Sequence, residues 1–263
     1  MKRFLQFIIH SGFAFLTVAT VSLFTFGLTS AWAETFVGSN VDSRVILAFH
    51  VNENAAQAWL PDGWMIASFS KGPLAGANLL VVLVDRHLAR DAEGNPTTPS
   101  SYRGVALVSL GSQEGSDETR AYVTRIYATP PGYDPYRNAI NARIGRSATH
   151  EVADNAASVR TEEWTVNPES GGEMTFALTY KSGIPSWSEG QALPYSNIDP
   201  DFHRIYRYDQ LVDLVMSVPA GKALAGETAF ATTIPEIAPM FDGNEKLIGI
   251  ISVPAYVRQV FLP

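Results

Sequence analysis

The sequence predicts one mostly β domain, an antiparallel β-barrel or sandwich with only minor α-helix. Short runs of β-forming residues recur along the chain and are separated by Gly, Pro and Asn, which is typical of barrels and sandwiches. No stretch shows sustained helical periodicity. Residues 34–263 are about as many as all-β proteins commonly hold in a single domain. The chain contains no Cys, so neither a disulfide bond nor thiolate chemistry is expected.

Residues 1–33 have the pattern of a secretory signal peptide and are expected to lie outside the fold. Lys2 and Arg3 give a positive start, Phe13–Leu28 is apolar, and Ala31-Trp32-Ala33 supplies the small residues of a cleavage site before Glu34. Cleavage would leave a mature domain, residues 34–263, in a bacterial periplasm or secreted. The alternative is an uncleaved anchor, since the apolar segment is nearly the ~20 residues that cross a bilayer. The mature domain itself is not expected to span the membrane.

The first half of the chain contains five expected strands and one short helix. Asn54 caps a helix over Ala55–Leu60 that ends at Pro61, because proline disfavours helical geometry in the residue before it. Leu79–Val84 is apolar at every position, so both faces of that strand are expected to be buried. The expected strands are Val41–Val51, Met65–Phe69, Asn78–Arg86, Gly104–Gly111 and Arg120–Thr129.

The second half begins with a Pro-Pro-Gly break at residues 130–132 and continues with Tyr136–Ile144, either a helical turn or an extended crossing. Ser158–Val166 and Glu173–Lys181 are expected to form a hairpin, because a turn-rich segment joins them. Ile184–Phe202 is expected to be a loop rich in Pro and aromatic residues. The remaining expected strands are His203–Val218, Gly226–Ile234 and Leu247–Phe261.

The charge of the chain excludes some classes of partner. Acidic residues outnumber basic ones by 26 to 19, whereas nucleic-acid binding depends on clustered Lys and Arg. Docking on an anionic membrane surface is disfavoured for the same reason. Only four lysines follow the leader segment: Lys71, Lys181, Lys222 and Lys246.

No motif predicts a metal or a cofactor. His150-Glu151-Val152-Ala153-Asp154 has Asp where a zinc-binding helix needs its second His, so a solvated loop is the better interpretation. Ser112 lies between glycines, but one place too early for a nucleophile elbow. His150 and Glu151 remain weak candidates for a general base.

Arginines are dense between residues 120 and 160, and a guanidinium group matches a carboxylate with two parallel hydrogen bonds. Arg125, Arg143 and Arg146 are therefore the candidates for binding an acid, with Tyr127 and Trp187 as apolar walls. Ion pairing with the many surface carboxylates is the alternative. Five aromatic residues flank the Pro-rich loop: Trp187, Tyr195, Phe202, Tyr206 and Tyr208. A lid over a cavity and ordinary core packing are the two interpretations of this group.

One passage resembles a known family. Ala56–Gly63, with its Leu-Pro-Asp-Gly ending, is followed by Gly72–Asp85, in which a Gly-Pro turn leads into an apolar strand. This order resembles the opening of the acetoacetate decarboxylase-like superfamily, and Ser101–Gly104 resembles the entry to its next strand. The resemblance covers the order of elements from about residue 41 to 262 and implies the same β-barrel fold.

The working residues of that family are not matched. The family's reaction uses a lysine amine that forms an imine with a β-keto acid, but the matching region, Tyr136–Glu151, offers arginines and no lysine. Gly104 stands where the family has an acidic residue. Because arginine stays protonated and cannot form an imine, the resemblance is taken to imply the fold and not the reaction.

The sequence therefore predicts an exported protein that binds a small organic acid, or an apolar small molecule, in a barrel cavity. One alternative is a lyase, decarboxylase or hydrolase of small keto or organic acids that uses non-lysine acid–base chemistry, with His150 or Glu151 as the base. Another is a structural envelope protein whose barrel is filled by side chains, which the apolar strand at Leu79–Val84 favours. The oligomeric state is not predicted.

Overall fold

The computed structural model describes residues 34–129, 134–152 and 158–263. The expected signal peptide, the Pro-Pro-Gly break at 130–132 and Asp154 lie outside the described residues. Within the described part of the chain, no helix is long and apolar enough to cross a membrane.

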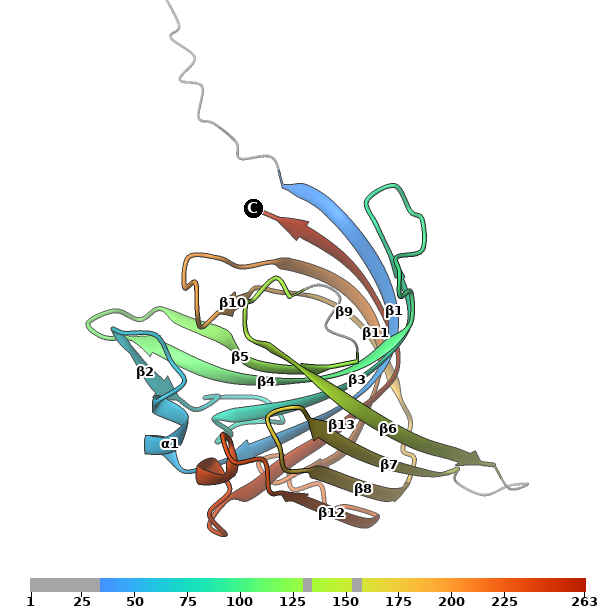
Figure 1. Ribbon diagram of the computed structural model, residues 1–263. Coiled ribbons are helices and arrows are strands. Elements are labelled where there is room, and N and C mark those ends of the chain that lie inside the picture. Colours follow the sequence, from blue (N-terminus) through green and yellow to red (C-terminus); the bar gives the residue numbers. More distant parts are fainter. Residues whose placement is uncertain (1–33, 130–133, 153–157) are drawn as a thin grey trace, which may run out of the picture. The chain divides into compact units, whose positions relative to one another are not determined.

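Strands dominate the described residues, which confirms the prediction of a mostly β fold (Figure 1). Two helical segments are short: α1 (Glu53–Gln57) and the 3-10 helix η1 (Ala238–Met240). The strands are β1 (Thr35–His50), β2 (Trp64–Ala67), β3 (Leu79–Arg90), β4 (Tyr102–Gln113), β5 (Thr119–Ala128), β6 (Ala139–Glu151), β7 (Val159–Pro168), β8 (Met174–Lys181), β9 (Ser186–Ala192), β10 (Pro194–Ser196), β11 (Ile205–Ser217), β12 (Gly226–Thr232) and β13 (Lys246–Leu262).

The sheet does not close into a barrel. Its hydrogen-bonded order is β12-β8-β7-β6-β5-β4-β3-β1-β13-β11-β9, so β12 and β9 are free edges, while β10 and β2 attach to β5 and β4. Most pairs are antiparallel, but β6 and β10 each run parallel to β5. The β5–β6 contact covers only three residue pairs. After it, β6, β7, β8 and β12 form a second part of the sheet that packs against the long curved strands (Figure 1).

The hydrophobic core lies between these two parts of the sheet. One buried cluster joins Leu47 and Val81 of the curved strands to Trp164 and Phe176 of β7 and β8. The strand predicted to be buried on both faces is fully buried on only one. Leu79, Val81 and Leu83 are 0% exposed, whereas the residues that alternate with them are only half-buried. The second face of the curved strands is therefore partly open to solvent.

Two local predictions differ from the structure, and the alternative left open for Tyr136–Ile144 is decided. The first helix starts earlier, because Asn52 rather than Asn54 caps it, accepting a hydrogen bond from the Ala55 N–H at 3.1 Å. The segment over Tyr136–Ile144 is extended where it enters β6. The expected loop at Ile184–Phe202 contains β9 and β10, because pairing of β9 with β11 outweighs its low intrinsic strand propensity. The β7–β8 hairpin is confirmed.

Candidate functional site

Arg125 and Tyr127 lie together on β5 and share one acceptor. Arg125 Nη2 donates to Glu236 Oε2 at 2.8 Å, and the Tyr127 hydroxyl donates to Glu236 Oε1 at 2.7 Å. The Arg125 guanidinium also lies 4.9 Å from the centre of the Trp59 ring. Burial raises the pKa of Tyr127 well above its usual range, and the bond to Glu236 adds to this effect. Glu236 therefore already compensates the charge of Arg125.

Arg146 is held between two carboxylates. Its Nη1 atom lies 2.7 Å from Asp85 Oδ2, and its Nη2 atom lies 3.1 Å from Glu162 Oε1. A further bond of 3.1 Å reaches the Ser43 hydroxyl on β1. These contacts connect β6 and β7 to β1 and β3 on the core side of the curved strands. The hydrogen-bond donors of Arg146 are therefore used to hold the two parts of the sheet together.

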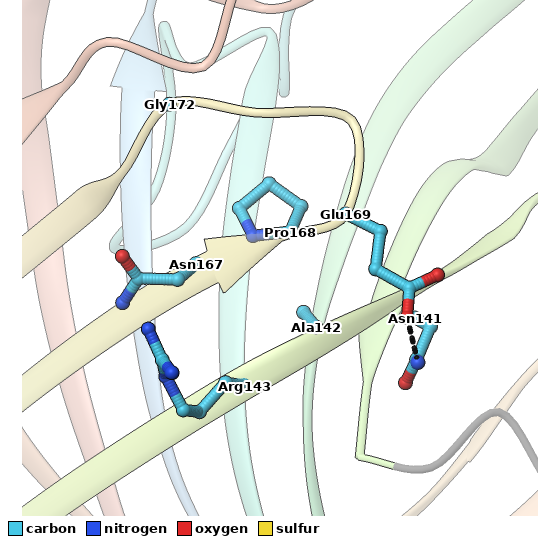
Figure 2. Close-up of a pocket in the computed structure, with 7 residues that line it drawn as sticks. All are labelled: Asn141, Ala142, Arg143, Asn167, Pro168, Glu169 and Gly172. Carbon is cyan, nitrogen blue, oxygen red and sulfur yellow. Dashed lines mark hydrogen bonds between the residues drawn. The ribbon is translucent and has the colours of Figure 1, made fainter.

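Arg143 lines a surface pocket of about 460 Å³ (Figure 2). Figure 2 shows its exposed side chain reaching toward Asn167, while the Asn141 amide donates to the Glu169 carboxylate beside it. The pocket is polar and formed by the ends of β6 and β7 and the turn after β7. Its lining residues are Asn141, Ala142, Arg143, Asn167, Pro168, Glu169 and Gly172.

The other predicted residues lie apart from these. Trp187 is on the edge strand β9 and is 61% exposed. His150 and Glu151 end β6 and are both exposed. The structure thus brings Arg125 and Tyr127 together, but places the remaining candidates at separate positions.

The sequence reasoning missed a different group of arginines, on the half-buried face of the curved strands. Asp42 is fully buried, and its carboxylate accepts from Arg44 Nη2 at 2.5 Å and from Arg86 Nε at 3.0 Å. Arg258 donates to Asn40, two residues before Asp42, at 2.8 Å. The register explains this grouping, because Asp42 lies opposite Arg86 on β3 and Asn40 lies opposite Arg258 on β13. Asp42, Arg44, Arg86 and Arg258 are called the arginine cluster below.

Aromatic rings hold the guanidinium planes of the arginine cluster in place. Arg44 lies 3.5 Å from the centre of the Tyr256 ring, and Arg258 lies 3.9 Å from that of Tyr206. Arg86 donates to the Tyr102 hydroxyl. Cation–π contacts of this kind favour the charged guanidinium group and fix its orientation.

The arginine cluster carries an excess of positive charge. Three guanidinium groups surround one carboxylate, and no other carboxylate in the described ranges forms an ion pair with them. Burial by itself raises the pKa of Asp42, but Arg86, Arg44 and Arg258 outweigh it and lower that pKa to about 2. The side chains of Arg44 and Arg86 remain 11% and 14% exposed. An anion arriving from solvent can therefore reach positive charge that Asp42 does not neutralise.

A pair of tyrosines adjoins the arginine cluster. The hydroxyl oxygens of Tyr136 and Tyr206 are 2.5 Å apart, and Tyr206 is the ring beneath Arg258. Tyr136 is buried, while Tyr206 is half-buried. This pair brings a titratable hydroxyl to the half-buried face.

No lysine reaches this face among the residues that the structure describes. Lys71, Lys181, Lys222 and Lys246 are all exposed. The described residues also contain no group of three or more His, Asp or Glu side chains that could hold a metal ion. The chemistry available at the arginine cluster is therefore that of guanidinium, carboxylate and phenol groups.

The sequence matches no family model and no curated protein, but solved structures resemble the chain. An enduracididine biosynthesis enzyme, MppR with HEPES buffer bound, has a TM-score of 0.57 at 10% identity over 89% of each chain. An acetoacetate decarboxylase-like enzyme from Sphingomonas wittichii RW1 has a TM-score of 0.54 at 11% identity, covering 93% of this chain and 97% of that one. The chain has the acetoacetate decarboxylase-like fold.

These matches confirm the fold that the resemblance in the sequence implied. A structure of MppR complexed with pyruvate also matches, with a TM-score of 0.55 and 11% identity over 88% of this chain and 91% of that one. The TM-scores show a shared fold, and at identities near one residue in ten the likeness extends to the fold alone. The activity has to be argued from the residues of this chain.

Proposed function

We propose that the protein binds a small organic acid at the arginine cluster and does not form an imine with it. The observation that carries the proposal is the excess of positive charge around Asp42 on a half-buried face of the sheet. Arginine is suited to this role because its planar fork donates two parallel bonds to a carboxylate. The pyruvate complex of MppR, which shares the fold, adds support for a small keto acid as ligand.

The placement of the lysines supports the proposal that no imine forms. A Schiff-base lysine must be neutral, which requires desolvation or a neighbouring cation, and all four lysines of the described domain are exposed. Arginine cannot replace lysine here, since it keeps its proton. Borohydride treatment with acetoacetate or pyruvate, followed by intact-mass analysis, should give no adduct. A covalent adduct would overturn this part of the proposal.

A calorimetric screen of pyruvate, acetoacetate and malonate tests the binding site. Arg44→Gln and Arg258→Gln should weaken binding about tenfold or more, since a charge-assisted hydrogen bond contributes about 1.5–3 kcal/mol. Arg207→Gln is the matched control, because Arg207 carries the same charge on the opposite face of β11 and pairs with Glu34. Thermal unfolding of each variant shows that it is folded. No heat with any acid, or equal affinity in all three variants, would refute the proposal.

The ligand-binding residues expected from the sequence are second to the arginine cluster as candidates for the acid-binding site. Arg125, Tyr127 and Arg146 already donate to carboxylates of the protein, and Trp187 is exposed. Arg143 is the exception, because it is exposed at the surface pocket of Figure 2. If Arg143→Gln, and not Arg44→Gln, lowers acid affinity, the binding site is this pocket.

A second candidate function, an enzyme using non-lysine acid–base chemistry on small keto acids, is favoured by the tyrosine pair beside the arginine cluster. His150 and Glu151 lie exposed at the end of β6, away from these groups. Incubation of each keto acid with the protein, followed by NMR of the products, separates a catalyst from a binding protein. Turnover would favour the enzyme, and unchanged acids would favour binding alone.

We also propose that the protein is exported and acts in the periplasm or outside the cell. The support is the order of charge, apolar run and small residues in the first 33 positions. The intact mass of protein from a periplasmic fraction should correspond to a chain that begins at Glu34. A mass that includes the first 33 residues would indicate an anchor instead.

A further inference from the structure

The hydroxyl contact between Tyr136 and Tyr206 is shorter than a typical bond between neutral hydroxyl groups. Its oxygen–oxygen distance is 2.5 Å, whereas neutral O–H···O bonds are most often about 2.7–2.8 Å long. Bonds from a hydroxyl to an oxygen anion are about 2.5–2.7 Å long. The contact therefore lies at the short end of the range for two neutral hydroxyl groups and within the range for a hydroxyl and a phenolate.

The surroundings select Tyr206 as the ionised member. The Arg258 guanidinium lies 3.9 Å from the centre of the Tyr206 ring, and positive groups approach from several elements. The charged and titratable groups around Tyr206 are Arg258 and Tyr256 on β13, Arg204 just before β11, Tyr208 on β11, Arg86 on β3, Tyr102 on β4, Tyr136 before β6, and Asp42 and Arg44 on β1. Asp42 is the one carboxylate in this group, and it already pairs with two arginines.

The electrostatic balance at the two phenols agrees with this assignment. Burial by itself disfavours a phenolate, but Arg258, Arg204 and the hydrogen bond from Tyr136 together lower the pKa of Tyr206. Burial and the neighbouring Tyr206 raise the pKa of Tyr136 well above its usual range. Tyr136 thus keeps its proton and donates it in the hydrogen bond.

We propose that Tyr206 is the proton-exchanging group of the arginine cluster, releasing its hydroxyl proton to solvent while the Tyr136 hydroxyl and Arg258 guanidinium hold the phenolate. The inference rests on the proposed function and deepens it, because it gives the acid-binding site a base that is not an amine. Tyr206 is half-buried rather than fully enclosed, and exchange of its proton with water is part of this proposal. When an acid binds, its carboxylate competes with the phenolate for the same arginines, and the phenolate takes up one proton from solvent.

Spectrophotometric titration of the mature protein, without ligand, tests this assignment. The ultraviolet difference spectrum of the parent should show one of the ten tyrosines titrating at lower pH than the others. Tyr206→Phe should lose that component. Tyr208→Phe is the matched control, because it removes a hydroxyl two residues along the same face of β11 and should keep it. Tyr136→Phe removes the donor and should shift the component to higher pH.

Two results would overturn the inference: a Tyr206→Phe titration identical to that of the parent, or loss of the component in Tyr136→Phe with its retention in Tyr206→Phe. The titration needs no ligand, so its result is independent of the calorimetric screen. If no acid binds but the Tyr206 component persists, only the proposed function fails. If acids bind and all tyrosines titrate together, only this inference fails.

Discussion

Replacement of Asp42 by Asn removes the one carboxylate of the arginine cluster and should destabilise the fold by about 3 kcal/mol. The side chain keeps its shape but loses its charge, leaving Arg44 and Arg86 without a counter-ion at a site where Asp42 is fully buried. Removing one partner of a buried ion pair typically costs about 3–5 kcal/mol. The partial exposure of both arginines places the expected value at the low end of that range.

The titration of Asp42 gives a similar magnitude. Its pKa falls from 3.8 to about 2, and each unit corresponds to about 1.4 kcal/mol of preference for the ionised form, or roughly 2–3 kcal/mol in all. For a domain of this size, about 3 kcal/mol lowers the melting temperature by roughly 6–12 °C. Because the folded pKa is depressed, this stabilisation is present above the unfolded pKa near 4 and is lost as the pH falls toward 2.

Chemical denaturation at neutral pH and near pH 3 measures both parts of this prediction. Asp42→Asn should unfold at lower denaturant concentration at neutral pH, and the difference from the parent should shrink in acid. Asp209→Asn is the control, because Asp209 is exposed on the opposite face of β11. An Asp42→Asn protein as stable as the parent at neutral pH would refute the view that Asp42 compensates the cluster.

Three further outcomes follow from the same contacts. Glu236→Gln removes the charged acceptor shared by Arg125 and Tyr127 and should lower the free energy of unfolding by about 1–3 kcal/mol; an unchanged denaturation midpoint would contradict this. Trp187→Ala should change that free energy by less than about 0.5 kcal/mol, because Trp187 is 61% exposed, and a larger loss would mean that the ring packs against something. Acid affinity should fall roughly tenfold as the pH rises through the Tyr206 titration, since the phenolate that forms adds a negative charge beside the bound carboxylate. Calorimetry across pH should show this fall in the parent and not in Tyr206→Phe.

The strands were predictable where their patterns are local. Alternating or apolar runs between Gly and Pro breaks predict β3, β7 and β8, and the structure has strands at these places. The edge strand β9 was missed because Ser, Glu, Gly and Gln have weak strand propensity, and its partner β11 follows only after an intervening segment. That the sheet stays open could not be predicted from the sequence either, because it depends on where β6 separates from β5.

The site was less predictable than the fold, because charge compensation comes from distant segments. The density of arginines drew attention to Arg125, but the carboxylate that neutralises it, Glu236, is 111 residues away. Arg86 and Asp42 are 44 residues apart, and only the β1–β3 register places them opposite one another. A usable signal was present in β13, where Arg258 interrupts a largely apolar strand and an unpaired charge would be costly.

If the half-buried face of the curved strands admits a keto acid, adding a buried amine there should allow imine formation. Val84 is the position of choice, because it is half-buried, lies opposite Arg44 on β1 and is two residues from Arg86 on the same face of β3. A lysine there would be desolvated and flanked by two cations, and both effects lower the pKa of an amine. Val84→Lys should therefore give a borohydride-trapped adduct with pyruvate, whereas the parent, whose described lysines are all exposed, supplies the negative control. A Val84→Lys protein with the parent's circular dichroism spectrum but no adduct would show that the half-buried face does not admit a keto acid, and the acid-binding proposal would fall with it.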